Sequence, residues 1–265
     1  MTHGFLVVDK PGGVTSHDVV AKARKDLNTR KIGHAGTLDP MATGVLVLGI
    51  GDGTRLLQYI TAGIKAYDAT VKLGELTSTD DKEGEVIATT EIPSDIPGAF
   101  AKQVGRIMQK PSSVSAIRID GKRAYDLVRE GVAVDIPARE VEVYEIKIND
   151  IQGDEVKISV KCSAGTYIRA IARDCGGHLT ALRRTQVGIF DLAMADKLMS
   201  VSEVAAKIFT PRQLDLHETA ELKFGRNIEA SGVGGIVAAI TPQGELAALL
   251  EDKDGMAKPF AVFIK

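Results

Sequence analysis

In this chain, segments with the residue pattern of strands do not alternate regularly with segments that have the pattern of helices. Residues 65–74, KAYDATVKLG, place Tyr67 and three aliphatic residues on one face, which is the period-two pattern of a strand with one buried side. Residues 141–150 and 155–163 are two further strand patterns joined by the turn IQGD, as in a β-hairpin. Because parallel strands need long crossovers, this order favours an α+β fold with a mixed, mainly antiparallel sheet and flanking helices.

Other segments extend this pattern. Residues 4–10 and 44–50 are short, strongly apolar runs that predict strands. Residues 115–131 predict a strand, a tight turn and a helix. Helices are expected where apolar residues recur every three or four positions, which is the case in residues 15–27, 54–60, 99–109, 165–175, 200–209 and 217–228.

Composition indicates a globular protein in a reducing compartment. Hydrophobic residues make up 44% and charged residues 26% of the 265 positions, which excludes a disordered chain. Cys162 and Cys175 are the two cysteines, and their spacing fits neither a disulfide framework nor a metal site. Because the sequence has neither an export signal nor an apolar run as long as a membrane span, we expect a soluble, cytoplasmic protein.

Charge is unevenly distributed along the chain. The formal net charge is −2, yet residues 157–184 contain six basic residues and a single acid, Asp174. Local clustering rather than the sum determines whether a protein binds a polyanion. From residue 200 the balance reverses, with seven basic and nine acidic residues and several short strand patterns separated by glycine-rich turns. We therefore expect a polyanion-binding main domain, residues 1–200, and a small, mostly β domain, residues 201–265, with the boundary between about 195 and 210.

The stretch GHAGTLDPMATGVLVLGIG, residues 33–51, places one carboxylate in a loop of small residues. Pro40 disfavours helical geometry at Asp39, so Asp39 lies on a bend before the apolar strand. Such an Asp can cap backbone N–H groups of its own turn. It can also act chemically if a nearby cation keeps it ionised, and Arg169, at the start of a predicted helix in the basic window, could be that cation.

Several segments, in order, are similar to the motifs of one family. GHAGTLDPMATGVLVLGIGDGTR resembles the catalytic-aspartate motif of the TruB family of tRNA pseudouridine synthases. The other segments that resemble motifs of this family are VVDKPGGVTSHDVV, KAYDATVKLGELTSTDDKEGEV, QKPSSVSAIRIDGKRAYDLVREG, and CSAGTYIRAIARDCG followed by HLTALRRTQVG. They cover most of residues 4–190, and the tail resembles the PUA-like, RNA-binding domain of bacterial members.

The resemblance implies isomerisation of uridine to pseudouridine in the T-loop of tRNA, at position 55. The glycosidic C–N bond breaks, the uracil turns and its C5 bonds to the sugar, with neither metal nor organic cofactor. The base must first be extruded from the loop. The implied partner is the T-arm stem-loop, and we expect a monomer without an obligatory protein partner. A guide-RNA-dependent enzyme of the dyskerin type and an RNA-folding protein with incidental catalysis are the alternatives.

Three residues match catalytic positions of the family. Asp39 matches the essential aspartate, which either attacks the sugar or removes a proton from it. Tyr67 matches the tyrosine that stacks on the target base and helps to remove the C5 proton, although alternation alone predicts a core residue there. Arg169 matches the arginine that pairs with the aspartate.

Further positions match substrate contacts. His34 matches the histidine that fills the space left by the extruded base, and Tyr167 and Leu182 match positions that line the base pocket. Lys10 belongs to the first motif, where a structural role and a direct contact are both open. The candidate phosphate contacts, which a solvated basic face would equally explain, are Lys22, Arg24, Lys25, Arg30, Lys31, Arg183 and Arg184. One departure from the family is the junction of Gly176 and Gly177, where a longer loop is expected and which leaves the contacts of His178 open.

Overall fold

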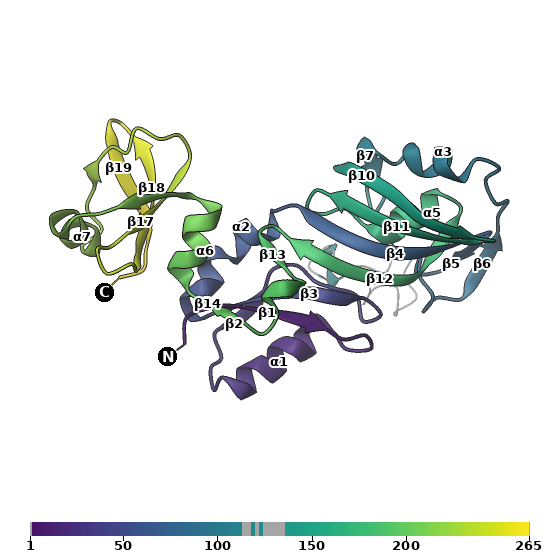
Figure 1. The fold of residues 1–265 in the computed structure, drawn as a ribbon, viewed down its shortest axis with the longest axis horizontal. Coiled ribbons are helices and arrows are strands. Elements are labelled where there is room, and N and C mark those ends of the chain that lie inside the picture. The colour runs from purple at the N-terminus through teal and green to yellow at the C-terminus, as the bar shows by residue number, and fades with distance from the viewer. Residues whose placement is uncertain (1, 113–117, 120–121, 124–135, 265) are drawn as a thin grey trace.

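A computed structural model describes residues 2–112, 118–119, 122–123 and 136–264 (Figure 1). Within these residues, a ten-stranded sheet forms the main body and a five-stranded sheet forms the C-terminal part. The strands of the large sheet, in spatial order, are β14 (Leu198–Met199), β1 (Gly4–Lys10), β3 (Thr43–Ile50), β12 (Gly177–Val187), β4 (Lys65–Leu73), β11 (Glu155–Cys162), β10 (Arg139–Gln152) and β7 (Gly105–Gln109), with β2 (Ile32–His34) on β3 and β13 (Phe190–Asp191) on β12.

Neighbouring strands of the large sheet are antiparallel except at its centre. There β12 runs parallel to β3, with Arg184 opposite Gly44. Gly44 has a φ of +100°, and a Cβ on it would lie 2.1 Å from the Arg184 carbonyl oxygen, so only glycine allows these strands to approach. The α+β prediction with a mainly antiparallel sheet is confirmed.

Helices pack on parts of the large sheet and lie in the connections between its strands. Helix α1 (Ser16–Asp26) begins at a capping box made by Thr15 and Asp18 and packs on β1 and β3. The other helices in the described residues are η1 (Gly51–Leu56), α2 (Leu57–Thr61), α3 (Ile96–Ala101), α5 (Ile168–Asp174), η2 (Leu192–Met194), α6 (Val201–Ile208) and α7 (Leu216–Lys223). No helix in the described ranges is long and apolar enough to cross a membrane.

The helix expected over residues 99–109 is wrong in its second half. Helix α3 ends at Ala101, and β7 follows and pairs with β10. Gly105, with a φ of +100°, ends helical geometry, and exposure then alternates along β7, as in a strand. The strand, turn and helix expected over 115–131 lie outside the described residues apart from β8 (Arg118–Ile119) and β9 (Lys122–Arg123).

The short junction after α5 is a tight turn. Gly176 has a φ of +85°, and its carbonyl oxygen accepts hydrogen bonds from the Gly74 N–H at 2.9 Å and the Thr90 hydroxyl at 2.8 Å. Strand β12 starts at the next residue, and His178 is buried with its Nδ1 3.0 Å from the Glu75 carbonyl oxygen. These two hydrogen bonds hold the turn against the residues that flank the hairpin of β5 (Glu75–Thr77) and β6 (Val86–Thr89).

Helix α6 lies between the large sheet and the C-terminal sheet (Figure 1). Its Val204 and Ala205 share one apolar cluster with Phe5 of β1 and with Ala238 of β17. The C-terminal strands are β15 (Thr210–Gln213), β16 (Ile228–Glu229), β17 (Ile236–Ile240), β18 (Leu246–Lys253) and β19 (Met256–Val262). The expected small, mostly β unit is therefore present, and the boundary at residue 200 stays a prediction because α6 packs on both sheets.

Candidate active site

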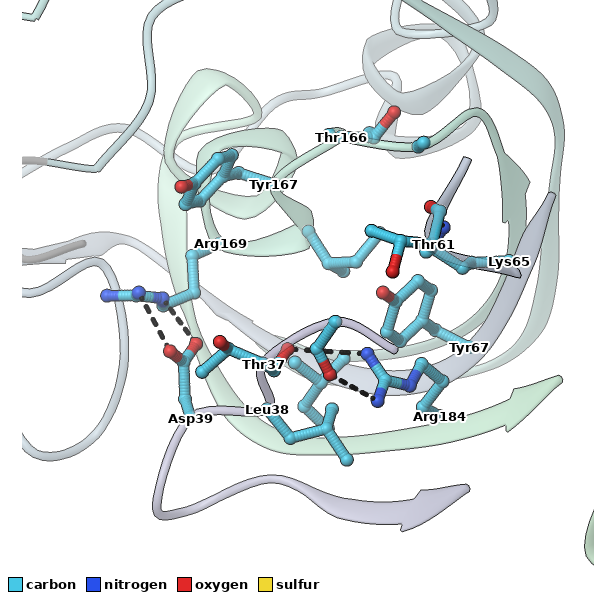
Figure 2. Close-up of a pocket in the computed structure, with 15 residues that line it drawn as sticks. Thr37, Leu38, Asp39, Thr61, Lys65, Tyr67, Thr166, Tyr167, Arg169 and Arg184 are labelled. Atoms are coloured by element: carbon cyan, nitrogen blue, oxygen red, sulfur yellow. Dashed lines mark hydrogen bonds and ion pairs between the residues drawn. The ribbon is translucent and has the colours of Figure 1, made fainter. Parts of the chain in front are cut away.

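A cavity of about 230 Å³ opens beside the centre of the large sheet (Figure 2). Three parts of the chain form its walls: the loop that contains Asp39, strands β4 and β12, and the segment that leads into α5. The side chains around it include Asp39, Tyr67, Tyr167, Arg169, Leu182, Lys65 and Arg184. Five of these seven were predicted as catalytic or base-pocket residues, and the fold brings them together from distant positions.

Asp39 and Arg169 form a two-point ion pair at one side of the cavity (Figure 2). The Arg169 Nε lies 3.0 Å from Oδ2 of Asp39, and its terminal nitrogen donates to Oδ1 at 3.2 Å. Arg169 is 4% exposed, whereas the Asp39 side chain is 34% exposed. A two-point contact fixes the orientation of the carboxylate, so Asp39 is held in place and stays accessible from the cavity.

Arg169 is itself fixed by a second carboxylate that the sequence did not indicate. Its NH1 donates to the Thr79 carbonyl oxygen at 2.8 Å and lies 3.5 Å from Oδ2 of Asp81. Asp81 is 4% exposed and accepts a hydrogen bond from the Thr79 hydroxyl. In the sequence, Asp81 belongs to the polar turn TSTDDKEGE, where nothing distinguishes it from a solvated acid.

Buried side chains hold the Asp39 loop from both ends. The Lys10 ammonium is fully buried and donates to the carbonyl oxygens of Val14 at 2.7 Å and Pro40 at 3.2 Å. Burial lowers the pKa of Lys10, and the Asp39 carboxylate opposes that change. Because Lys10 does not line the cavity, its contacts favour the structural alternative over a direct substrate contact.

The other end of the loop is held by Arg184. This guanidinium is 1% exposed and donates to the carbonyl oxygens of Gly36 at 3.0 Å, Thr37 at 3.3 Å and Val45 at 2.8 Å. A side chain so enclosed has no face for a solvent-exposed phosphate. The prediction of Arg184 as a phosphate contact is therefore wrong, because Arg184 follows Leu182 by two residues on β12 and lies with it on the buried face of the strand.

The Tyr67 side chain lines the cavity and also packs in the hydrophobic core. Its side chain is 8% exposed and belongs to the apolar cluster beneath the site, as alternation predicts, and it also faces the cavity. Burial raises the pKa of Tyr67, and the Arg184 guanidinium acts in the opposite direction. The hydroxyl is thus neutral at physiological pH, and its aromatic face is available to a planar ligand.

The remaining predicted contacts lie at different distances from the cavity. Tyr167 is the N-cap of α5, and its backbone N–H and carbonyl are both held by the Gln109 amide. His34 lies on β2, outside the cavity lining, with its ring edge-on to His17 at 5.6 Å. Five of the predicted phosphate contacts are exposed and Arg183 is half-buried; the exposed ones are Lys22, Arg24, Lys25, Arg30 and Lys31. Acidic or carbonyl groups pair with Lys22, Arg24, Lys31 and Arg183. No group of His, Cys, Asp or Glu among the described residues is arranged to hold a metal ion.

Comparison with known proteins identifies the class. Residues 24–168 match the model of the TruB family pseudouridylate synthase, N-terminal domain, and residues 209–264 match the model of the C-terminal domain of tRNA pseudouridine synthase II. The chain therefore belongs to the TruB family. It is 48% identical to tRNA pseudouridine synthase B of Corynebacterium glutamicum (strain R) over 94% of this chain and 92% of that protein. The corresponding protein of Arthrobacter sp. (strain FB24) is 46% identical over 99% of this chain and 97% of its own length.

Solved structures with the same fold are more distant in sequence. An H/ACA RNP bound to a substrate RNA containing 2′-deoxyuridine holds a chain that is 24% identical, with a TM-score of 0.72 over 99% of this chain and 86% of that chain. A Cbf5-Nop10-Gar1 complex holds another, also 24% identical, with a TM-score of 0.71 over 99% and 84% of the two chains. At this identity, the likeness establishes the fold alone.

Proposed function

We propose that this chain isomerises the uridine at position 55 in the T-loop of tRNA to pseudouridine. One observation carries the proposal: the Asp39 carboxylate, held at two points by Arg169, lies at the edge of a cavity that has the Tyr67 ring on its other side (Figure 2). The 46–48% identity to proteins named tRNA pseudouridine synthase B supports tRNA as the substrate.

The proposed chemistry uses only groups of the chain and the nucleotide. The C1′–N1 bond breaks and its electron pair stays on the uracil, while Asp39 either bonds to C1′ or takes the proton from C2′. The uracil then turns against the Tyr67 ring and C5 bonds to C1′, as the Asp39–C1′ bond breaks in the first route or as Asp39 returns the proton to C2′ in the second. The proton on C5 leaves and N1 gains one, which regenerates the Asp39 carboxylate. Arg169 orients the Asp39 carboxylate for either route, and the reaction needs no metal or organic cofactor.

The target base has to leave the T-loop to reach the cavity, and unstacking costs a few kcal/mol that new contacts must offset. Tyr67, Tyr167 and Leu182 surround the cavity and supply those contacts. His34 lies outside the lining, five residues before Asp39. That position suits a residue that fills the gap in the RNA rather than one that binds the extruded base.

We also propose that the protein acts as a cytoplasmic monomer without guide RNA. Relatives that share almost their whole length with this chain are named as tRNA enzymes, whereas the H/ACA-type chains are only 24% identical. A T-arm stem-loop presented without any other RNA distinguishes the two alternatives.

The proposed function can be tested by following hydrogen at C5. A T-arm stem-loop labelled with tritium at C5 of its uridines should release one tritium per RNA when the purified protein is added, because C5 loses its hydrogen on bonding to C1′. The matched control RNA has cytidine at position 55 and should release none. If the protein binds the stem-loop and no tritium is released, the enzyme hypothesis is wrong and the RNA-folding alternative is favoured.

Replacing Tyr67 with Phe should slow turnover and leave RNA binding nearly intact. The variant keeps the ring that stacks on the base but lacks the hydroxyl placed to assist loss of the C5 proton, and such assistance contributes about 10²-fold or more. Single-turnover tritium release measures the rate, and filter binding measures the affinity. An unchanged rate would remove the proton-transfer role and leave Tyr67 as a stacking residue.

Removing charge from the exposed basic residues should weaken RNA binding and its response to salt. For the double variant Lys25→Gln and Arg30→Gln, each lost phosphate contact should reduce the slope of log affinity against log salt by about 0.7 to 0.9. Filter binding of the T-arm between low and moderate salt gives this slope. An unchanged slope would show that these residues form only a solvated face.

A further inference from the structure

Two buried cationic side chains, Lys65 and Arg184, line the cavity on the same side as the Tyr67 ring. Lys65 precedes Tyr67 by two residues on β4, so both side chains point to the same face of the strand. Lys65 is 6% exposed and lines the cavity together with Arg184, which is 1% exposed. The Lys65 ammonium donates to the carbonyl oxygens of Thr61 at 2.6 Å and Gly63 at 2.7 Å, at the end of α2.

Neither cation has a carboxylate partner among the described residues. Lys65 and Arg184 donate to backbone carbonyl oxygens, whereas Arg169 faces two carboxylates. Burying a cation without a counter-ion is costly, and the nearby Arg184 guanidinium adds to the cost of charging Lys65, because it lowers the pKa of that lysine. Core packing alone would be better served by uncharged side chains, so the positive charge of this wall is available to a negative charge on a molecule bound in the cavity.

The reaction proposed above creates such a charge at this place. When the C1′–N1 bond breaks, the bonding electron pair stays on the uracil and spreads over N1, O2 and O4. This anion forms whether Asp39 bonds to C1′ or removes the C2′ proton. A uracil stacked on Tyr67 lies against the wall that contains Lys65 and Arg184, and Asp39 contributes negative charge from the other side.

We propose that Lys65, together with Arg184, stabilises the uracil anion electrostatically during cleavage of the glycosidic bond. The inference rests on the proposed function, since it assigns a role within that reaction. Charges fixed in advance around a developing anion lower the barrier because they need no reorganisation during the step. Arg184 additionally fixes the Asp39 loop through Gly36 and Thr37, so Lys65 is the residue at which the charge can be tested separately.

The environment of Lys65 predicts a distinctive pH dependence. Burial and the Arg184 guanidinium lower its pKa to about 8, and the Cys162 thiol is the other titratable group beside it. Burial raises the pKa of Cys162 to about 11, and arginine stays charged, so neither of these changes charge near pH 8. Lysine is cationic below its pKa; the rate of bond cleavage should therefore fall as pH rises through about 8.

The experiment compares three variants in single-turnover assays on a T-arm stem-loop. Lys65→Gln keeps a hydrogen-bond donor and loses the charge, and it should be slower by about 10- to 100-fold with RNA affinity nearly unchanged. Lys65→Arg keeps the charge and should recover most of the rate, without the loss of rate near pH 8. Lys72→Gln removes a lysine from the opposite face of β4 and should behave like the wild type.

The possible results distinguish a failure of the proposed function from a failure of the role proposed for Lys65. If the wild type forms no pseudouridine, the proposed function fails before Lys65 is considered. If the wild type is active and Lys65→Gln is equally fast, or loses affinity and rate in the same proportion, the electrostatic role is wrong. Circular dichroism reports whether Lys65→Gln folds; if it does not, the pH profiles of the wild type and Lys65→Arg decide, and identical profiles overturn the inference.

Discussion

Replacing Asp39 with Asn is expected to lower the rate of pseudouridine formation by at least about 10⁴-fold. Asparagine has nearly the same shape and still accepts a hydrogen bond from Arg169, but it can neither bond to C1′ nor take a proton from C2′. RNA affinity should change by less than about threefold, because Asp39 acts on the sugar after the base has entered the cavity. Single-turnover tritium release and filter binding on the same T-arm preparation give the two quantities.

The matched control for Asp39 is Asp52, which lies beyond the cavity lining and pairs with Lys31. Asp52→Asn should turn over at the wild-type rate, which would show that losing an ion-paired carboxylate elsewhere in the same domain has no general effect on turnover. A large fall in RNA affinity for Asp39→Asn, with the rate of bound RNA preserved, would instead mark Asp39 as a residue that shapes the loop.

Replacing Arg169 with Met should damage both turnover and stability. Asp39 loses its two-point partner, and the rate should fall by about 10³-fold because the carboxylate is no longer held in place. The Asp81 carboxylate, 4% exposed, loses its cationic partner, and breaking a buried pair on one side costs about 3 to 5 kcal/mol of unfolding free energy. Urea denaturation measures the second effect, and rates are taken where the variant is folded.

Two further variants show whether the charge of Arg169 or its two-point contact with Asp39 is needed. Arg169→Lys keeps one positive charge but cannot make the two-point contact, so it should recover stability more than rate. Arg173→Met removes an arginine one turn further along α5 that pairs with Asp80, and it should retain turnover. A rate for Arg169→Met within a few-fold of the wild type would show that Asp39 needs no partner in order to act.

Local patterns predicted several strands, among them β1, β3, β4, β10 and β11, and most helices, because each pattern depends on residues close in sequence. The alternation at Tyr67 is an example, and the strand lies where it was expected. The helix expected over 99–109 failed in part because the left-handed geometry at Gly105 cannot be read from an apolar run. Helix α6, which packs on both sheets, likewise cannot be assigned to one domain from its own sequence.

Site residues that belong to a family motif could be predicted from the sequence. Residues whose importance comes from burial in the folded sheet could not. Family resemblance named Asp39, Tyr67 and Arg169, which the fold brings to one cavity. Arg184 was misassigned because its burial depends on the packing of β12 against the Asp39 loop, a contact between residues far apart in sequence. Asp81 and Lys65 gave no signal because burial, which gives a charged side chain its importance here, is a property of the folded chain.

Mapping the modified nucleotide shows whether this chain forms pseudouridine at the proposed position and whether Asp39 is required. Unmodified tRNA is incubated with purified wild-type protein or with Asp39→Asn, without any guide RNA, and pseudouridine is located by carbodiimide-dependent primer extension. We predict a single strong stop that reports pseudouridine at position 55 with the wild type, and none with Asp39→Asn. A tRNA that is bound but unmodified by the wild type, or modified equally by Asp39→Asn, would contradict the account.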